Sequence, residues 1–297
     1  MGLWGPDVQT PGRDPNYLDM LRETIVDAAR EAVDALQPAS LVAARGELAG
    51  WIRNARDAEI VDRDLLVLRA LNDANEPIFT LLNLACHPEV LWNDSTLISP
   101  DYAGAACRAV EREGGVAALA VGAIGGMLTP DAPDHSVASV TAMGSAVAAR
   151  ALQLLAGAKR LSVEQIAFRR KTVPLPVETP LLQAAVDAGL VPVAHDDAGR
   201  TVTEVGLALL DPVRMATAPG ELLPQVGFEV KALLDCPYPF IVGLADDEIG
   251  YVLPQDAFVL PDDPFEPGDH YEETMSLGPD TAPGLLAAWQ ELLAEIE

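Results

Sequence analysis

The side chains best suited to chemistry lie in three segments, each of which follows a run of apolar residues. The first segment, N-L-A-C-H-P-E, places His87 at the end of a predicted strand over residues 78–86. A histidine at a strand end, facing a loop with carboxylates such as Asp94 and Asp101, can ligate a metal ion or move a proton. The alternative is a strand-end histidine that bonds only to backbone groups. The spacing alone leaves both interpretations open.

The second segment, G-A-I-G-G-M-L-T-P-D, follows the apolar run of residues 116–121. Its small residues allow backbone N–H groups near Gly125 and Gly126 to approach a ligand closely. Thr129 presents a hydroxyl immediately before a proline. That hydroxyl could act as a nucleophile, donate to an oxyanion, or close a simple turn.

The third group of candidates lies in the last third of the chain. Glu221 follows Pro219-Gly220 at the predicted start of a helix, where the helix N-terminus favours an ionised carboxylate. Tyr251 follows a predicted strand and a turn, and Tyr271 lies in the segment H-Y-E before a Gly-Pro turn. The alternatives are a glutamate that only stabilises a first helical turn, and two buried tyrosines with satisfied hydroxyls.

Interleaved strands and helices must position these side chains. They predict an α/β fold with a mixed, largely buried sheet flanked by helices in a single large domain. Helices are predicted over residues 17–36, 101–113, 136–155, 179–188, 220–234 and 282–296. Strands are predicted over residues 41–48, 65–71, 78–86, 116–121, 204–210, 213–216 and 240–244, with an extended segment over residues 162–177. The near-continuous apolar runs 78–86 and 116–121 are expected to be buried strands.

Composition excludes several classes of partner. The formal net charge of −26 disfavours nucleic acid, because phosphate binding needs a basic surface. No apolar run approaches the roughly 20 residues that a membrane span needs, so no transmembrane segment is predicted. The opening M-G-L-W-G-P-D lacks the basic and apolar regions of a signal peptide. Three cysteines without C-x-x-C spacing indicate neither a disulfide framework nor a cysteine zinc site.

Five segments, taken in order, resemble the neutral, non-lysosomal ceramidases over the N-terminal catalytic domain of that family. They are NLACHPEVLWNDSTLISPDYAG, ALAVGAIGGMLTPD, PGELLPQVG, IVGLADDEIGYVLPQDAF and HYEETMSLGPDTA. The family has a strand-end histidine, an S-x-D-Y-x-G-like segment, a small-residue turn before a proline, a P-x-E segment, a tyrosine-valine segment and a Y-E…G-P-x-T segment in this order. The resemblance covers nearly the whole chain.

The resemblance implies roles for individual residues. His87, Glu221 and Tyr251 match three zinc ligands. Thr129 matches the position of a catalytic serine, and Tyr271 matches a tyrosine that holds the amide or the developing oxyanion. An active-site arginine after Asn54 is matched by Arg56, although the segment R-N-A-R also leaves Arg53 open.

Two departures from the family pattern bear on activity. The family's remaining zinc ligand lies in a His-x-His segment, and neither His135, His195 nor His270 is in such a segment. We therefore expect residues 1–297 to form a ceramidase-like catalytic domain without its first strands, its His-x-His segment and the family's carboxy-terminal sandwich domain, with Met1 an internal methionine of a longer gene. Zinc would then be weakly bound or absent. Thr129 is the second departure, because a β-methyl group crowds a nucleophile.

Three functional hypotheses follow. The leading one is zinc-dependent hydrolysis of an N-acyl amide, in a ceramide-like lipid or a related small molecule, impaired by the missing segment. The second is a metal-free α/β protein that has lost catalysis and acts by binding. The third is a zinc amidohydrolase or esterase that acts on sugars or peptides.

Overall fold

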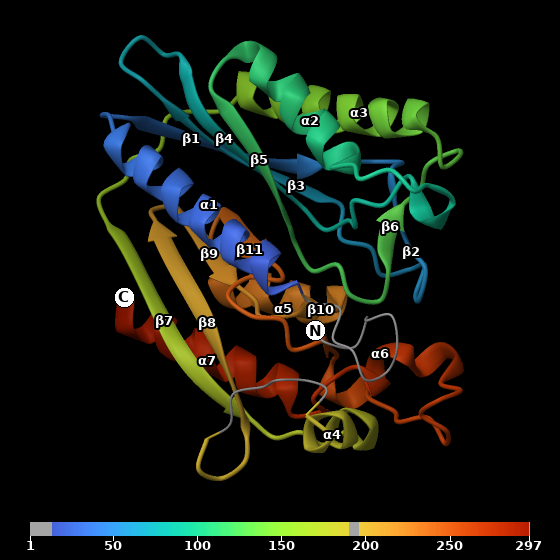
Figure 1. Ribbon diagram of the computed structural model, residues 1–297. Coiled ribbons are helices and arrows are strands. Elements are labelled where there is room, and N and C mark those ends of the chain that lie inside the picture. Colours follow the sequence, from blue (N-terminus) through green and yellow to red (C-terminus); the bar gives the residue numbers. More distant parts are fainter. Residues whose placement is uncertain (1–13, 190–195, 297) are drawn as a thin grey trace.

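In the computed structural model, which describes residues 14–189 and 196–296, two four-stranded sheets face each other and helices cover their outer faces (Figure 1). The first sheet has the strand order β1-β3-β4-β5. Its strands are β1 (Ser40–Glu47), β3 (Asp64–Leu71), β4 (Pro77–Leu84) and β5 (Val116–Val121). The first three are antiparallel, and β5 runs parallel to β4. Helices α2 (Asp101–Val110) and α3 (Val137–Ala156) pack against each other on its outer side.

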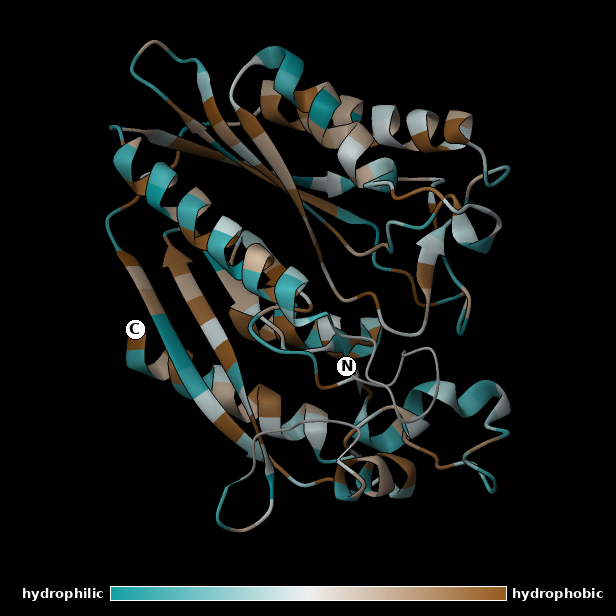
Figure 2. Ribbon diagram, viewed as in Figure 1, coloured by the Kyte–Doolittle hydropathy of each residue, from teal (hydrophilic) through white to brown (hydrophobic). Residues whose placement is uncertain are grey.

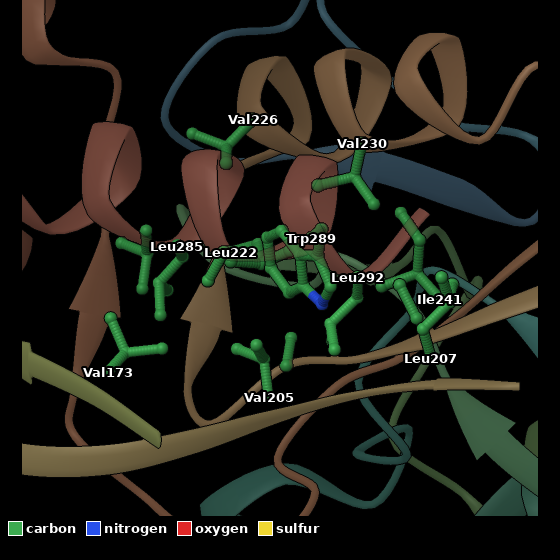
Figure 3. Packing of buried hydrophobic residues seen from close by; sticks show 14 of the residues in the cluster. Val173, Val205, Leu207, Leu222, Val226, Val230, Ile241, Leu285, Trp289 and Leu292 are labelled. Atoms are coloured by element: carbon green, nitrogen blue, oxygen red, sulfur yellow. The ribbon is translucent and has the colours of Figure 1, made fainter. Parts of the chain in front are cut away.

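The second sheet has the order β11-β9-β8-β7. Its strands are β7 (Ile166–Leu175), β8 (Thr201–Leu210), β9 (Val213–Thr217) and β11 (Tyr238–Val242), and β11 runs parallel to β9. Helices α5 (Pro224–Leu234) and α7 (Thr281–Ile296) cover it. Trp289 of α7 is fully buried between Val205 of β8 and Val226 of α5, and its indole N–H donates to the Thr217 carbonyl at 3.2 Å (Figure 3).

The two sheets meet where β11 lies against β4 and β5. The buried Asn83 side chain joins them, because its amide donates to the Ala120 carbonyl at 2.9 Å and to the Ile241 carbonyl at 2.8 Å. Two backbone bonds hold the strand ends together, from Gly122 N to the Leu84 carbonyl and from Gly243 N to the Val121 carbonyl. The carboxyl ends of β4, β5 and β11 therefore converge, as ligand-binding edges of α/β sheets do.

Short elements complete the fold around this convergence. Strand β2 (Ile52–Asn54) pairs antiparallel with β6 (Leu128–Pro130), and β10 (Glu221–Leu222) pairs parallel with β12 (Tyr251–Val252). The remaining helices are α1 (Pro15–Asp34), α4 (Pro180–Asp187), α6 (Tyr271–Thr274) and the 3₁₀ turns Trp92–Asp94, Glu111–Glu113, Gln255–Ala257 and Gly268–His270.

Helix α1 begins as the sequence predicts, with the Asp14 carboxylate accepting from Asn16 N at 2.9 Å and Pro15 at the first helical position. Apolar residues such as Leu18 and Ile25 recur along it, yet no residue of α1 is buried by the described part of the chain. Figure 2 shows hydrophobic and hydrophilic residues alternating along this helix. The amphipathic pattern thus forms the helix although no element among residues 14–189 and 196–296 buries its apolar side chains.

The predicted α/β class is confirmed, and the long predicted helices and strands are present with ends shifted by a few residues. Burial of two strands differs from the prediction. Strand β5 is half-exposed along its length because it lies at the end of its sheet, pairing only with β4 among the described strands. Strand β4 is buried mainly in its second half. Both strands are largely hydrophobic (Figure 2). The apolar runs therefore predicted the positions of the strands correctly, but not how deeply each strand is buried.

The prediction of a helix from Gly220 to Leu234 is wrong at its start. Glu221 lies in strand β10, and α5 begins only at Pro224. Proline is favoured in the first helical turn because it has no N–H to leave unpaired, and it therefore fixes the start of α5 there. The argument that a helix N-terminus stabilises the Glu221 carboxylate consequently does not hold.

Among residues 14–189 and 196–296, α3 is the one helix long and apolar enough to cross a membrane by length and composition. Its buried face, which includes Val140, Met143 and Val147, packs into the core beneath α2. Burial of this face accounts for part of the apolar character of α3.

Lys231 lies on α5, which covers the second sheet, and forms ion pairs with carboxylates at and just before the start of β3 in the first sheet. Its ammonium group lies 2.6 Å from Asp62 and 2.9 Å from Asp64, and the lysine and Asp62 side chains are 10% and 4% exposed. Lys231→Ala should lower the free energy of unfolding by about 3 kcal/mol, because it leaves the buried Asp62 carboxylate without its cation, whereas Asp64 keeps its ion pair with Arg45. Urea unfolding measures this loss.

The control is Lys159→Ala, at an exposed lysine, which should change the free energy of unfolding by less than about 0.5 kcal/mol. Equal effects of the two substitutions would contradict a role for Lys231 in joining the layers.

Candidate functional site

His87 lies three residues beyond β4, and a single backbone carbonyl holds it. The Leu128 carbonyl of β6 accepts from His87 N at 2.8 Å and from the imidazole Nδ1 at 2.9 Å. Because a carbonyl only accepts, Nδ1 carries a proton, and Nε2 keeps its lone pair in the neutral ring. This arrangement is typical of metal-ligating histidines.

Glu221 lies opposite the free nitrogen of His87. Its Oε2 is 3.4 Å from His87 Nε2, and this oxygen is buried without a hydrogen-bond partner among the residues that the structure describes. Burial alone would lower the pKa of His87, but the interactions with Glu221 and the Leu128 carbonyl outweigh burial and raise it. An unpartnered buried carboxylate oxygen costs free energy, so a positive group beside Glu221, such as a protonated His87 or a bound cation, would stabilise this pair.

Tyr251 stands beside Glu221 because β10 and β12 pair in parallel with these two residues in register. Burial, followed by the negative charge of Glu221, raises the pKa of Tyr251 above its ordinary value. The Tyr271 ring packs edge-on against Tyr251 with 5.9 Å between the ring centroids. Tyr271 is 45% exposed, so it lies at the rim while Tyr251 lies deeper.

Arg56 anchors the helix that carries Tyr271. Its guanidinium contacts Glu272 at 2.6 Å and Glu273 at 2.7 Å, and the two glutamate side chains are 9% and 0% exposed. The Asn54 side chain accepts from the Arg56 backbone N–H at 2.9 Å. The structure thus brings Arg56 to the site, whereas Arg53 is exposed on β2.

Thr129 lies on β6 and is 2% exposed. Its hydroxyl donates to Glu89 Oε1 at 2.7 Å. Glu89 also lines a cavity of about 430 Å³ between residues 88 and 101, together with Trp92 and Leu97. The threonine is therefore joined to that cavity through Glu89.

The small-residue turn between β5 and β6 passes beneath the candidate site. The N–H of Gly125 donates to the Leu222 carbonyl at 2.9 Å, so it is already used in holding β10. Gly126 and Met127 have positive φ values of 68° and 60°. The tight turn brings β6, and with it Leu128 and Thr129, back beside β2.

Sequence reasoning missed three residues near the candidate site, Glu89, Glu272 and Glu273. Glu89 follows His87 and Pro88 directly, but nothing in the spacing of the neighbouring residues indicates that its carboxylate contacts Thr129. The glutamates follow Tyr271 directly, and nothing in the sequence pairs them with Arg56 more than 200 residues away. His195, like the opening residues 1–13, lies outside the described residues.

The side chains around Glu221 are of mixed chemical type. Among the described residues, no group of three or more His, Cys, Asp and Glu side chains is arranged to hold a metal ion. His87, Glu221 and Tyr251 instead lie together as one nitrogen ligand, one carboxylate and one phenol. Imidazole and carboxylate are both ordinary zinc ligands.

Fold and site together define an α/β protein with a His–Glu–Tyr cluster at the convergence of three strand ends. The crystal structure of neutral ceramidase from Pseudomonas aeruginosa is similar over 92% of this chain and 54% of that chain, with a TM-score of 0.68 and 18% identity. A ceramidase structure complexed with C2 is similar over 90% of this chain and 56% of that one, with a TM-score of 0.70 and 16% identity.

The chain thus spans about half the length of the solved ceramidases that it matches. No family model and no curated protein matches its sequence. At these identities the likeness is one of fold, and at that level it confirms the resemblance to neutral ceramidases that the five segments predict.

The Arg56 network provides a test of how the Tyr271 helix is held. Arg56→Ala should lower the free energy of unfolding by about 3 kcal/mol, because two buried glutamates lose their cation. Arg53→Ala, at the exposed neighbour, is the matched control and should have almost no effect. Chemical denaturation of both variants shows which of the two arginines stabilises the helix that carries Tyr271.

The same network should give a pH dependence. Burial raises the pKa of Glu273, but hydrogen bonds from Arg56 and His270 more than reverse this, so the pKa is lowered on folding. The pair therefore stabilises the fold fully above the unfolded value of about 4.3, and this contribution disappears as pH falls through the lower folded value. The destabilisation by Arg56→Ala should be smaller at pH 3 than at pH 7 in urea unfolding. An effect independent of pH would contradict this assignment.

Proposed function

We propose that this chain carries the zinc-binding core of an amidohydrolase that cleaves an N-acyl amide bond in a lipid or a related small molecule. The observation that carries the proposal is the buried Glu221 Oε2, unpartnered within the described residues and 3.4 Å from His87 Nε2. A cation bound to both groups would satisfy the carboxylate oxygen and use the imidazole lone pair.

The donor set fits zinc. His87 would bind through Nε2, since Nδ1 is committed to the Leu128 carbonyl. Glu221 and Tyr251 would bind through oxygen, and a positive ion beside Tyr251 would counteract the burial and negative charge that raise its pKa. Zinc bound there would supply Lewis-acid activation of water and of the amide carbonyl.

The surrounding side chains serve to orient and stabilise. Tyr271, at the exposed rim, presents a phenol that can donate a hydrogen bond to the oxygen on which negative charge develops. Arg56 keeps Tyr271 in place by clamping Glu272 and Glu273 of the same helix. Thr129 is tied to Glu89 at the wall of the neighbouring cavity, where it holds that carboxylate in one orientation.

The substrate class is drawn from the solved ceramidases, whose fold this chain shares, and from the five ordered segments. The cavity beside Glu89 has polar groups such as Asn93 and Ser99 and apolar groups such as Leu91 and Leu97. This mixture suits a molecule with a polar head and an apolar chain.

Zinc titration of the purified chain against a competing chelator tests the metal site. We expect one zinc per chain, held weakly because three protein ligands are at hand. His87→Ala and Glu221→Ala should each weaken zinc binding by more than the roughly 10- to 100-fold that loss of an outer-shell partner costs. Hydrolysis of a fluorogenic N-acyl amide should require added zinc and fall with the same substitutions.

His135→Ala is the matched control, since His135 is exposed and bonds through Nδ1 to the Val90 carbonyl. It should leave zinc affinity unchanged. Zinc binding that is absent in the unmodified chain, or equal in the His87 and His135 variants, would contradict the proposal.

A second function, a metal-free binding protein, is favoured by one observation. Thr129 is buried and its hydroxyl is engaged, so it does not reach a substrate as it stands. If the chain binds no zinc yet retains a lipid amide in equilibrium dialysis, this second function replaces the first.

A further inference from the structure

The loop that carries His87 is held at both ends by two adjacent residues of α2. Asp101 is 3% exposed, and its carboxylate accepts from Val90 N and Leu91 N, each at 3.0 Å. The same carboxylate accepts from Tyr102 N at 2.7 Å. Three backbone N–H groups thus converge on one side chain, which fixes the segment that follows His87.

Tyr102 holds the segment that precedes His87. Its side chain is fully buried, and its hydroxyl donates to the Cys86 carbonyl at 2.7 Å. The peptide group between Cys86 and His87 therefore has its oxygen bonded to Tyr102 and its N–H bonded to the Leu128 carbonyl. With both polar groups of this peptide fixed, the backbone of His87 has little freedom to rotate.

The start of α2 is itself rigidly placed. Gly144 of α3 approaches it so closely that a Cβ atom there would lie 2.5 Å from Ala105 Cβ and 2.9 Å from the Tyr102 carbonyl oxygen. Asp101 has a positive φ of 50°, a conformation that costs free energy for a residue with a Cβ atom. The chain keeps this costly conformation at Asp101, the residue whose carboxylate accepts the hydrogen bonds from Val90 and Leu91.

We propose that Asp101 and Tyr102 are positioning residues for His87, which set the direction of its Nε2 toward Glu221 through the backbone on either side of it. The expected effect on metal binding rests on the proposed function. The orientation of the His87 ring can be tested without any metal. Neither residue touches the Glu221 carboxylate, so the effect passes through the loop.

The test is Tyr102→Phe, which removes one hydrogen bond and keeps the ring that packs in the core. The first readout is metal-free: long-range ¹H–¹⁵N spectra of protein labelled in its four histidines report which ring nitrogen carries the proton. His87 should show a single tautomer protonated at Nδ1, and Tyr102→Phe should give a mixture of tautomers. Zinc affinity should also weaken about 10- to 100-fold, as for the loss of other outer-shell partners.

Thr80→Val is the control for a purely structural role. Thr80 is buried in the middle of β4, seven residues before His87, and accepts a hydrogen bond from Arg69 Nε at 2.8 Å. This substitution should lower stability while leaving the His87 spectrum and zinc affinity unchanged. Asp101→Asn provides a second variant of the loop if Tyr102→Phe does not fold, and it should shift the His87 signals in the same way.

The outcomes separate the two claims. If the loop variants lose stability but keep the His87 spectrum of the unmodified chain, the positioning role is overturned. If the unmodified chain binds no zinc while the loop variants still change the His87 tautomer, the positioning role stands and the proposed zinc function falls.

Discussion

The Leu128 carbonyl is the constraint on which the candidate site depends. It accepts from both the backbone N–H and the ring Nδ1 of His87. A residue held at these two points has a fixed backbone and a fixed ring tautomer, so Nε2 can point in only one direction. Leu128 is placed in turn by the antiparallel pairing of β6 with β2 and by the tight turn through Gly126. The orientation of the His87 imidazole therefore depends on how β2, β6 and the turn before β6 pack together.

Glu221 gives the second half of this arrangement. A two-residue strand would be marginal alone, and β10 persists because β12 pairs with it and Gly125 N donates to Leu222. This support places a carboxylate oxygen in a buried position without a donor from the described residues. Most buried polar groups in folded proteins have a hydrogen-bond partner, and this carboxylate oxygen differs from the other unpartnered atoms of the described residues in lying beside a histidine ring nitrogen.

The sequence predicts much of this fold because its long elements have a period. Helix α7 and strand β8 repeat apolar residues over ten or more positions, and such patterns survive uncertainty about their ends. The strands β2, β6, β10 and β12 contain two or three residues each, too few for any period. These short strands hold Thr129, Glu221 and Tyr251, so the sequence predicted the candidate residues by motif but not how they meet.

The depth of burial of each strand could not be predicted from local sequence patterns either. The apolar run of β5 predicted a covered strand, but cover depends on which element lies alongside, and that is a property of the whole fold. Likewise, the choice between Arg53 and Arg56 depended on glutamates far along the chain. Long-range contacts of this kind leave no trace in the spacing of neighbouring residues.

The placement of Thr129 bears on how an amide would be attacked. A nucleophilic hydroxyl must approach a carbonyl carbon, and a side chain that is 2% exposed and carries a β-methyl group is poorly suited to this. Its hydroxyl is also committed to Glu89. His87, Glu221 and Tyr251 lie instead beside one another, with the Glu221 carboxylate 3.4 Å from the His87 ring and Glu221 in register with Tyr251. Within the proposed hydrolysis, Thr129 is therefore better suited to hold Glu89 in place than to form a covalent intermediate.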